Sequence, residues 1–445
     1  MVKRDGKQLT KSSYKMKRTN VLIIGSGGRE HALAWKIKRS AKIEDIYVAP
    51  GNPGTAMLGC KNIPLSPVRE NFITLADMAE HLDIGLVIVG PDNALAEGIV
   101  GFFKNRHIPV FGPEDSWFIE SSKWQAKQLM RKVGIPTADF EIFDDPDKAI
   151  DYVRHKKGDV VVKADGLALG KGVFPCTYDV AKAEEAIRDL MIKKTLGAAG
   201  ETVVIEDRLE GPELSIHALC DGEHVTLFPA VRDHKRLLDG DTGPMTGGMG
   251  VCGPIAVDPA LMETIEKKIV LPCIKELYWR GSPFVGCLYP GIMLTKEGPK
   301  VLEFNARFGD PETQAYMRLL EDDVDFFEVL LACTQARLNQ VKIRWKKQKC
   351  VCITLAAEGY PGVSRKGNPI ELGRYHDQED TGGGIVFQCG TLADKGHLVT
   401  NGGRVLSFTA LLNDEKEALD WPCKAINRHI RFEGMQHRTD IGKVW

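Results

Sequence analysis

Residues 21–50 contain the pattern that most restricts how this chain can fold. An apolar strand (VLII) is followed by a glycine-rich turn (GSGG), a helix (REHALAWKIKRS) and a second strand (DIYVAP). This order is typical of a parallel βαβ unit. Two further apolar segments, residues 85–91 and 109–113, continue the alternation. We therefore expect an α/β fold that opens with a doubly wound, Rossmann-like domain over residues 20–120.

The rest of the chain has a different pattern. Helical spacing near residues 121–133 is followed by strands and helices in irregular order, including VVVKADG, TVVIED, ELSIHALCDG, a helix near 259–280, GCLYPGIMLT and KVLEFNARF. The last hundred residues, roughly 346–445, contain several short apolar strands and predict a small β-rich domain. No internal repeat or low-complexity linker divides the chain.

Composition limits the classes of partner. Lysine and arginine (59) nearly balance aspartate and glutamate (60), so no net field attracts nucleic acid or an anionic membrane. No stretch approaches the ~18 to 20 apolar residues that span a bilayer. The eleven cysteines show no repeated spacing and predict reduced thiols in a cytoplasmic compartment, with Cys350 and Cys352 as buried residues on one face of a strand.

Residues 1–19 are basic, with seven lysines and arginines and one acid, Asp5. They lack the apolar core of a secretory signal, so we expect a solvated, disordered tail. Met16 is an alternative start, and an organelle-targeting role stays open.

The turn after the first strand contains Gly25, Gly27 and Gly28. Backbone amides at such a helix N-terminus can hold a phosphate, with Arg29 as a further contact. A nicotinamide cofactor is disfavoured, because Glu30 stands where the dinucleotide fingerprint has its third glycine. Two alternatives remain: a site for a smaller phosphorylated ligand, or glycines needed only for a tight turn.

A second glycine-rich segment, VVVKADGLALGKGV, places Lys163 near the end of an apolar strand, followed by Gly166, Gly170, Lys171 and Gly172. It is not a Walker loop, because β-like sequence rather than a helix follows the second lysine. A glycine-rich hairpin of this kind can fold over a polyphosphate while Lys163 supplies a fixed charge. The alternative is a solvated turn with incidental lysines.

The segment KVLEFNARFGDPETQ alternates with a period of two, which puts Glu303, Asn305 and Arg307 on one face of a strand and Phe304 on the other. Carboxylate and amide oxygens suit a magnesium ion that also binds phosphate oxygens. Arg307 can clamp a carboxylate or phosphate. The alternative is an edge strand with one solvated face.

A polar segment from Asp233 to Gly253, beginning DHKRLLDGDTGPMTGGMG, is expected to form a long functional loop. Its acids, bases and glycines suit a polar substrate. His234 is either a general base or a positioning residue.

Taken together, these motifs resemble the ATP-grasp family, and within it the phosphoribosylamine–glycine ligases, from about residue 20 to the C-terminus. The motifs that carry the resemblance are VLIIGSGGREHALAWK, VAPGNPGT, VVVKADGLALGKGV, DHKR with DTGPMTGGMG, VLEFNARFGDPETQ, AAEGYPG and TNGGRVL. The resemblance implies an ATP-grasp domain of two α+β subdomains over residues 121–345, with a flap subdomain at about 140–212. The C-terminal domain then covers residues 346–445.

The resemblance also implies where ligands bind. ATP would lie between the two subdomains, with an adenine-binding hinge at 206–209 and a ribose contact from Glu213. The implied ATP-binding residues are Lys123, Lys163, Gly166, Leu167, Gly170, Lys171, Gly172, Glu206, Leu209 and Glu213. Glu303 and Asn305 would bind Mg²⁺ or Mn²⁺. The implied substrate-binding residues are Gly27, Gly28, Arg29, Glu30, Gly51, Asn52, Asp233, Lys235, Arg307, Gly309, Asp310 and Pro311, and the implied catalytic residues are Arg307, Lys163 and Asp233.

Two positions depart from the family pattern. Met245 stands where the family usually has asparagine, which removes one polar contact from the substrate segment. Glu358 replaces a smaller residue before GYPG, and we interpret it as a surface change.

The implied activity is ligation of glycine to 5-phosphoribosylamine in purine synthesis, with ATP, glycine and the amine as partners, glycyl phosphate as the intermediate, and a monomer or weak homodimer as the assembly. Two other functions stay open. One is an ATP-grasp ligase for another acid, such as a carboxylase or a peptide-forming ligase. The other is a nucleotide-binding module that has lost catalysis.

Overall fold

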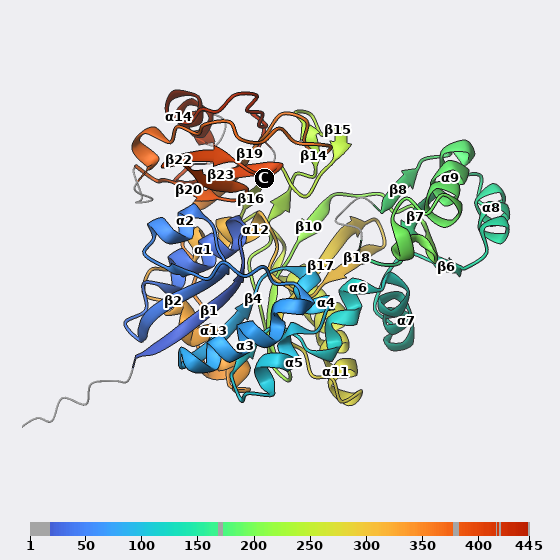
Figure 1. The fold of residues 1–445 in the computed structure, drawn as a ribbon. Helices are drawn as coiled ribbons and strands as arrows, with labels where there is room; N and C mark the ends of the chain where they lie inside the picture. The colour runs from blue at the N-terminus through green and yellow to red at the C-terminus, as the bar shows by residue number, and fades with distance from the viewer. Residues whose placement is uncertain (1–17, 168–171, 377–381, 415, 418–419, 444–445) are drawn as a thin grey trace, which may run out of the picture.

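The computed structural model describes residues 18–167, 172–376, 382–414, 416–417 and 420–443 (Figure 1). Residues 1–17, which hold most of the predicted tail and Met16, lie outside this part of the chain. The first unit is a five-stranded parallel sheet in the order β3-β2-β1-β4-β5. Its strands are β1 (Thr19–Gly25), β2 (Ile43–Pro50), β3 (Lys61–Asn62), β4 (Ile84–Val89) and β5 (Val110–Phe111). The strand order reverses at β1 and β4, which confirms the predicted doubly wound fold.

Strand β1 shows how this sheet is buried on both faces. Val21 and Ile23 pack into one apolar cluster, and Leu22 and Ile24 pack into another. This is the period-two alternation of a strand covered on both sides. The helices of this unit are α1 (Gly28–Ile37), α2 (Pro53–Met57), α3 (Phe72–His81), α4 (Asp92–Ala96) and α5 (Ile99–Lys104).

Later segments contribute to one face of the same sheet. Helix α12 (Glu312–Leu319) packs on α1, and α13 (Phe326–Thr334) packs on β5. Met317 of α12 and Leu330 of α13 join the apolar cluster that contains Val21 and Ile23. The N-terminal sheet is therefore held to the middle of the chain by a shared core.

The central sheet is antiparallel, in the order β10-β17-β11-β12, with β18 paired to β17. Its strands are β10 (Glu213–Ser215), β11 (Ala218–Asp221), β12 (Val225–Leu227), β17 (Val285–Thr295) and β18 (Gly298–Asn305). A near-continuous helical stretch runs through α10 (Pro259–Ile265), a π-helical turn (Glu266–Val270) and α11 (Leu271–Trp279), as the sequence predicts for 259–280. It shares an apolar cluster with α7 (Lys123–Val133), which follows the short α6 (Phe118–Ser121).

A separate four-stranded antiparallel sheet, β6-β9-β7-β8, forms the region predicted as the flap. It contains β6 (Phe140–Phe143), β7 (Val160–Ala164), β8 (Val173–Cys176) and β9 (Val203–Asp207), with α8 (Pro146–His155) and α9 (Val180–Ile187). These elements have their own apolar cluster. Figure 1 shows them projecting from the rest of the molecule. The glycine-rich segment joins β7 to β8, so the predicted hairpin is confirmed.

The C-terminal sheet has the order β13-β16-β19-β23-β20 and is not built from the C-terminal residues alone. Strands β13 (Arg232–Asp233) and β16 (Gly250–Gly253) come from the segment predicted as a long loop, and β14 (Arg236–Leu238) pairs with β15 (Thr242–Met245) in a hairpin. The loop prediction was therefore wrong. Period-two patterning was hidden because these strands are two to four residues long and rich in glycine.

The remaining strands of the C-terminal region are β19 (Lys349–Ala356), β20 (Gly384–Gln388), β21 (Thr391–Asp394), β22 (His397–Thr400) and β23 (Arg404–Leu412), and α14 (Trp421–His429) follows them. Cys350 and Cys352 of β19 are fully buried free thiols in one cluster, as predicted. The α/β fold with a small β-rich C-terminal region is confirmed. None of the helices in the described part of the chain combines the length and the hydropathy needed to cross a bilayer.

Candidate active site

The buried carboxylate of Glu206 joins two lysines from different elements. Lys127 of α7 and Lys163 of β7 each place Nζ 2.8 Å from a carboxylate oxygen of Glu206 on β9. Burial disfavours the charged lysine and lowers the pKa of Lys127 to about 8, against the opposing effect of Glu206. The two lysines in turn lower the pKa of Glu206, although burial acts the other way. These residues form a fixed group of charges beneath the flap hairpin.

Lys163 and Glu303 lie in the same site. The ammonium of Lys163 donates to the carbonyl of Leu302 at 3.1 Å, next to Glu303 on β18. Burial alone would raise the pKa of Glu303, but the surrounding cations hold it below its ordinary value; they are Lys235, Lys123, Lys163 and Arg307. A carboxylate amid four cations stays ionised, and the lysines and the arginine around it offer positive charges to a polyphosphate.

Helix α7 begins at this site. The hydroxyl of Ser122 caps the helix by accepting from Gln125 N–H, and Asp165 accepts from Trp124 N–H at 2.7 Å. Lys123 Nζ lies 3.4 Å from the Gly166 carbonyl, and burial lowers its pKa. This places the predicted Lys123, Gly166 and Leu167 at the base of the flap hairpin. The predicted Gly170 and Lys171 lie outside the described residues, whereas Gly172 pairs with Ala164 at the start of β8.

Arg307 lies just beyond the end of β18, not on the strand as the alternation predicted. The break comes because the chain turns at residues 306–307. Its Nη2 lies 3.1 Å from Asn305 Oδ1 and 2.9 Å from a carboxylate oxygen of Glu120. Glu120 also accepts from Ala306 N–H at 2.6 Å, so this carboxylate fixes both the turn and the guanidinium. The Arg307 Nε is buried without a partner among the described residues and is available to an anionic ligand.

A second buried carboxylate, Glu312, lies at the start of α12. It accepts from the Tyr289 hydroxyl at 2.6 Å, and that hydroxyl lies 2.8 Å from Ser215 Oγ. The Gly309 N–H donates to His217 Nε2 at 2.9 Å, and burial keeps the pKa of His217 well below its ordinary value, so the ring is neutral. A Cβ on Gly309 would lie only 2.4 Å from Glu312 Oε2. A side chain at residue 309 would therefore displace the Glu312 carboxylate, the His217 ring or the loop.

Asp233 of β13 lies close enough to Glu312 for the two carboxylates to interact. Burial and the charge of Glu312 raise the pKa of Asp233 well above its ordinary value, and its Oδ1 is buried without a hydrogen-bond partner in the described chain. Lys235 lies 3.5 Å from Glu213 of β10. The carboxylates of Glu213, Asp233, Glu303 and Glu312 raise the pKa of Lys235 despite its burial. His234 is buried against the Gly250 carbonyl, and burial lowers its pKa, which favours the positioning role over that of a general base.

The N-terminal glycine turn has its polar groups occupied. Gly27 N–H donates to Glu30 Oε2 at 2.6 Å, and Arg29 Nε donates to Glu30 Oε1 at 2.6 Å. Glu30 is 1% exposed, and a Cβ on Gly90 would lie 1.9 Å from it. The Glu30 side chain thus fills the space between β1 and β4 where a dinucleotide phosphate would otherwise approach. Arg29 extends to the Phe308 carbonyl at 3.1 Å.

The predicted Gly51 and Asn52 follow β2. Asn52 is 5% exposed, accepts from Thr55 N–H, and donates to the carbonyls of Ser26 and Gln388. These bonds use all the polar groups of its side chain. The geometry therefore favours a bracing role for the Asn52 side chain, while its contact with a substrate stays a prediction.

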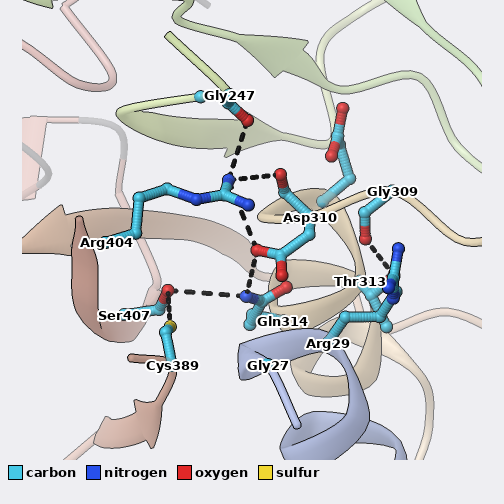
Figure 2. Close-up of polar contacts among 12 residues, drawn as sticks. Gly27, Arg29, Gly247, Gly309, Asp310, Thr313, Gln314, Cys389, Arg404 and Ser407 are labelled. Atoms are coloured by element: carbon cyan, nitrogen blue, oxygen red, sulfur yellow. Dashed lines mark hydrogen bonds and ion pairs between the residues drawn. The ribbon is translucent and has the colours of Figure 1, made fainter. Parts of the chain in front are cut away.

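Figure 2 shows where three distant segments meet around Asp310. Arg404 of β23 donates from Nη1 to the carbonyls of Gly247 at 2.7 Å and Asp310 at 2.6 Å. Gln314 of α12 donates to the Asp310 carboxylate at 2.9 Å. Burial would raise the pKa of Asp310, but Arg404 and Arg29 lower it. The Asp310–Pro311 peptide is cis.

Comparison with known proteins identifies the family of this chain. Three family models match the chain: the phosphoribosylglycinamide synthetase N domain over residues 19–117, the ATP-grasp (A) domain over 121–313 and the C domain over 350–444. The phosphoribosylamine–glycine ligase of Caldanaerobacter subterraneus is 42% identical over 424 residues, which cover 95% of this chain and 99% of that protein. The chain belongs to the phosphoribosylamine–glycine ligase family.

Solved structures agree with membership of the phosphoribosylamine–glycine ligase family. The phosphoribosylamine–glycine ligase of Thermotoga maritima superposes with a TM-score of 0.81 at 32% identity, covering 95% of this chain and all of that one. The biotin carboxylase domain of the Hydrogenobacter thermophilus 2-oxoglutarate carboxylase has a TM-score of 0.71 at 15% identity, covering 94% of this chain and 91% of that one. The second likeness shows only that the fold is shared.

Several residues of this site were not predicted from the sequence. Glu312 and Arg404 lie inside motifs that were recognised, but no local pattern showed their roles. Lys127 follows Lys123 by four positions on one helix, a spacing that puts both on one face. Glu120 gave no signal, because its contacts with Ala306 and Arg307 span 186 or more positions. Both positions that depart from the family pattern are exposed to solvent. Met245 on β15 is 36% exposed, and Glu358 is a surface residue 3.4 Å from Arg365.

Proposed function

We propose that this protein joins glycine to 5-phosphoribosylamine at the expense of ATP, giving glycinamide ribonucleotide, ADP and phosphate in purine synthesis. The observation that carries the proposal is the shared site of Lys163 and Glu303, where the lysine ammonium donates to the carbonyl of Leu302, the residue before Glu303. Family membership supports the choice of substrates. ATP would then lie between the flap sheet and β18, near Lys123, Lys163 and Lys127.

The residues at the end of β18 fit a divalent cation that also binds phosphate. Glu303 offers an ionised carboxylate and Asn305 an amide oxygen, now 3.1 Å from Arg307 Nη2. No group of three or more histidine, cysteine or acidic side chains suited to a metal occurs in the described part of the chain. Phosphate oxygens and water would therefore have to complete the coordination shell of the ion. Magnesium favours such mixed coordination with phosphates and water. When bound, Mg²⁺ or Mn²⁺ would neutralise developing charge on the phosphates.

In the first step, a carboxylate oxygen of glycine attacks the γ-phosphorus of ATP while the bond to the β–γ bridging oxygen breaks. The products are glycyl phosphate and ADP. Lys163, held by Glu206 and the Leu302 carbonyl, supplies a fixed positive charge to the phosphates. Arg307, held by Glu120, directs its free Nε to an anionic oxygen.

In the second step, the amine nitrogen of phosphoribosylamine attacks the carbonyl carbon of glycyl phosphate, the carbon–oxygen bond to phosphate breaks, and the nitrogen loses a proton. We assign that proton to Asp233, because burial and Glu312 raise its pKa and its Oδ1 has no partner among the described residues. Gly28, Arg29, Gly51, Gly309 and Pro311 would line the substrate side. Closure of the flap hairpin would keep water from the acyl phosphate.

The deciding experiment is an omission assay. Purified protein, ATP, Mg²⁺ and glycine are mixed with phosphoribosylamine formed from ribose 5-phosphate and ammonia, and ADP and the amide are measured as each component is left out. We expect both products only in the complete mixture. ADP formation that needs bicarbonate in place of glycine would favour a carboxylase, and ATP binding without turnover would favour an inactive nucleotide-binding module.

We further infer a cytoplasmic location from the eleven free cysteines, and a monomer or weak homodimer. Sedimentation at micromolar concentration tests the second inference. A stable higher oligomer contradicts it.

A further inference from the structure

Two residues of the C-terminal region, Tyr360 in the turn after β19 and Arg404 of β23, contact the segment at Gly247. The Tyr360 hydroxyl accepts from Gly247 N–H at 3.0 Å, and Arg404 Nη1 donates to the Gly247 carbonyl at 2.7 Å. The peptide groups on both sides of the Gly247 Cα are therefore held by C-terminal side chains. Tyr360 is itself fixed by close packing, since a Cβ on Gly403 would lie 2.2 Å from its ring.

The same guanidinium holds a second segment. Arg404 Nη1 donates to the Asp310 carbonyl at 2.6 Å and lies 3.5 Å from Asp310 Oδ1 (Figure 2). One arginine thus connects the segment that follows hairpin β14–β15 to the segment that precedes α12. Both carbonyls accept from the same nitrogen, so a lysine ammonium, with three donors on one atom, could restore part of this contact.

The two segments meet next to the proposed proton acceptor. A Cβ on Gly248 would lie 2.6 Å from Pro311 Cδ and 2.9 Å from Asp233 Oδ1. Gly248 therefore packs between the cis-proline and the unpartnered carboxylate oxygen. Any shift of Gly247 or Asp310 moves the groups that surround this oxygen.

We propose that Arg404 is a positioning residue that couples the two half-reactions by holding the Gly247 and Asp310 segments in register around Asp233. This inference rests on the proposed function. Arg404 would not touch the reacting atoms. Its loss would leave glycyl phosphate formation possible but place Asp233 and the bound amine out of line, so that the acyl phosphate is hydrolysed instead of captured. A misplacement of about 1 Å can lower a rate by about 100-fold.

The test measures amide formed per ADP in wild type, Arg404→Met, Arg404→Lys and Tyr360→Phe. We expect a ratio near one for wild type, a fall of at least about 10-fold for Arg404→Met with kcat/KM for phosphoribosylamine down about 100-fold, and partial rescue by Arg404→Lys. Tyr360→Phe, which removes one hydrogen bond to Gly247, should move the ratio in the same direction by about 3-fold. Arg365→Met is the matched control, because Arg365 is a half-exposed C-terminal arginine that pairs with Glu433.

The outcomes separate the two proposals. If wild type forms no amide from glycine, the proposed function fails. If wild type forms the amide and the Arg404 variants keep the wild-type ratio of amide to ADP, the positioning role is overturned. The same holds if KM for phosphoribosylamine rises while that ratio is unchanged, because Arg404 would then be a direct ligand of the amine. Near-ultraviolet circular dichroism checks that each variant is folded, and Tyr360→Phe keeps the inference testable if Arg404→Met is not.

Discussion

Two regions of the site are built in opposite ways. The lysine–carboxylate group of Lys127, Lys163, Glu206 and Glu303 stands mainly on regular strands, with opposite charges 2.8 Å apart. The junction around Asp310 is loop backbone held by side chains of α1 and β23, and its contacts join segments 279 and 94 positions apart through backbone carbonyls. Strands fix side chains by their own hydrogen bonds, whereas loops need partners from elsewhere. The lysine–carboxylate group, which we propose faces the phosphates and call the phosphate side, should therefore respond to loss of charge. The junction around Asp310, which we propose faces the substrates and call the substrate side, should respond to small changes of shape.

The strongest test of the phosphate side is Glu303→Ala. We expect glycine-dependent ADP formation to fall by about 1,000-fold or more, because the only carboxylate on the metal-facing end of β18 is lost. Glu297→Ala is the matched control, since Glu297 is an exposed residue just before β18 that pairs with Lys300. Turnover within a few-fold of wild type in Glu303→Ala would contradict the metal assignment.

Gly309→Ala tests the substrate side by shape alone. Its added Cβ would lie 2.4 Å from Glu312 Oε2 and 2.9 Å from His217 Nε2, so the Glu312 carboxylate, the His217 ring or the loop must shift. We expect kcat/KM for glycine to fall by about 100-fold while ATP binding is retained, as measured by initial rates and calorimetry. The control is Gly101→Ala on α5, whose Cβ would meet only Glu114 at 3.3 Å. If kcat/KM for glycine fell equally in Gly309→Ala and Gly101→Ala, the substrate side would not be especially sensitive to changes of shape.

The lowered pKa of Lys127 should make the stability of the folded protein depend on pH. Its folded pKa is lowered to about 8 from an ordinary 10.5, so between these values the unfolded chain keeps a proton that the folded protein has released. Stability then rises with pH across this window. We expect the unfolding free energy of wild type minus that of Lys127→Met to increase by on the order of 2 kcal/mol from pH 8 to pH 10.5. Denaturant titrations of wild type and Lys127→Met measure this difference. A flat difference across the window would mean that the pKa of Lys127 is not lowered.

The smallest expected effect is at Glu213, predicted to contact the ribose and now 3.5 Å from Lys235. Glu213→Gln should raise KM for ATP by about 5-fold with kcat unchanged, because one hydrogen bond to a charged acceptor is weakened. Glu210→Gln, at an exposed residue that pairs with Arg208, is the control. No change in KM for Glu213→Gln would place the ribose elsewhere.

Prediction from sequence succeeded where pattern and chemistry coincide. The strand positions of Lys163 and Glu303, the β7–β8 hairpin and the parallel N-terminal sheet followed from periodicity and glycine spacing. It failed for the segment 233–253, because strands as short as Arg232–Asp233 carry no detectable period. It also placed Arg307 on the strand, although the chain turns after Asn305 and Glu120 holds the turn.

By itself, the sequence determined the class of fold and the family, because these depend on residue type and on spacing along the chain. Only the tertiary structure decided that Glu120 holds Arg307, that Glu312 lies beside Asp233, and that Arg404 reaches Gly247 and Asp310. The physical reason is distance along the chain: a contact between residues about eighty or more positions apart exists only after the sheets have packed. No local pattern encodes it.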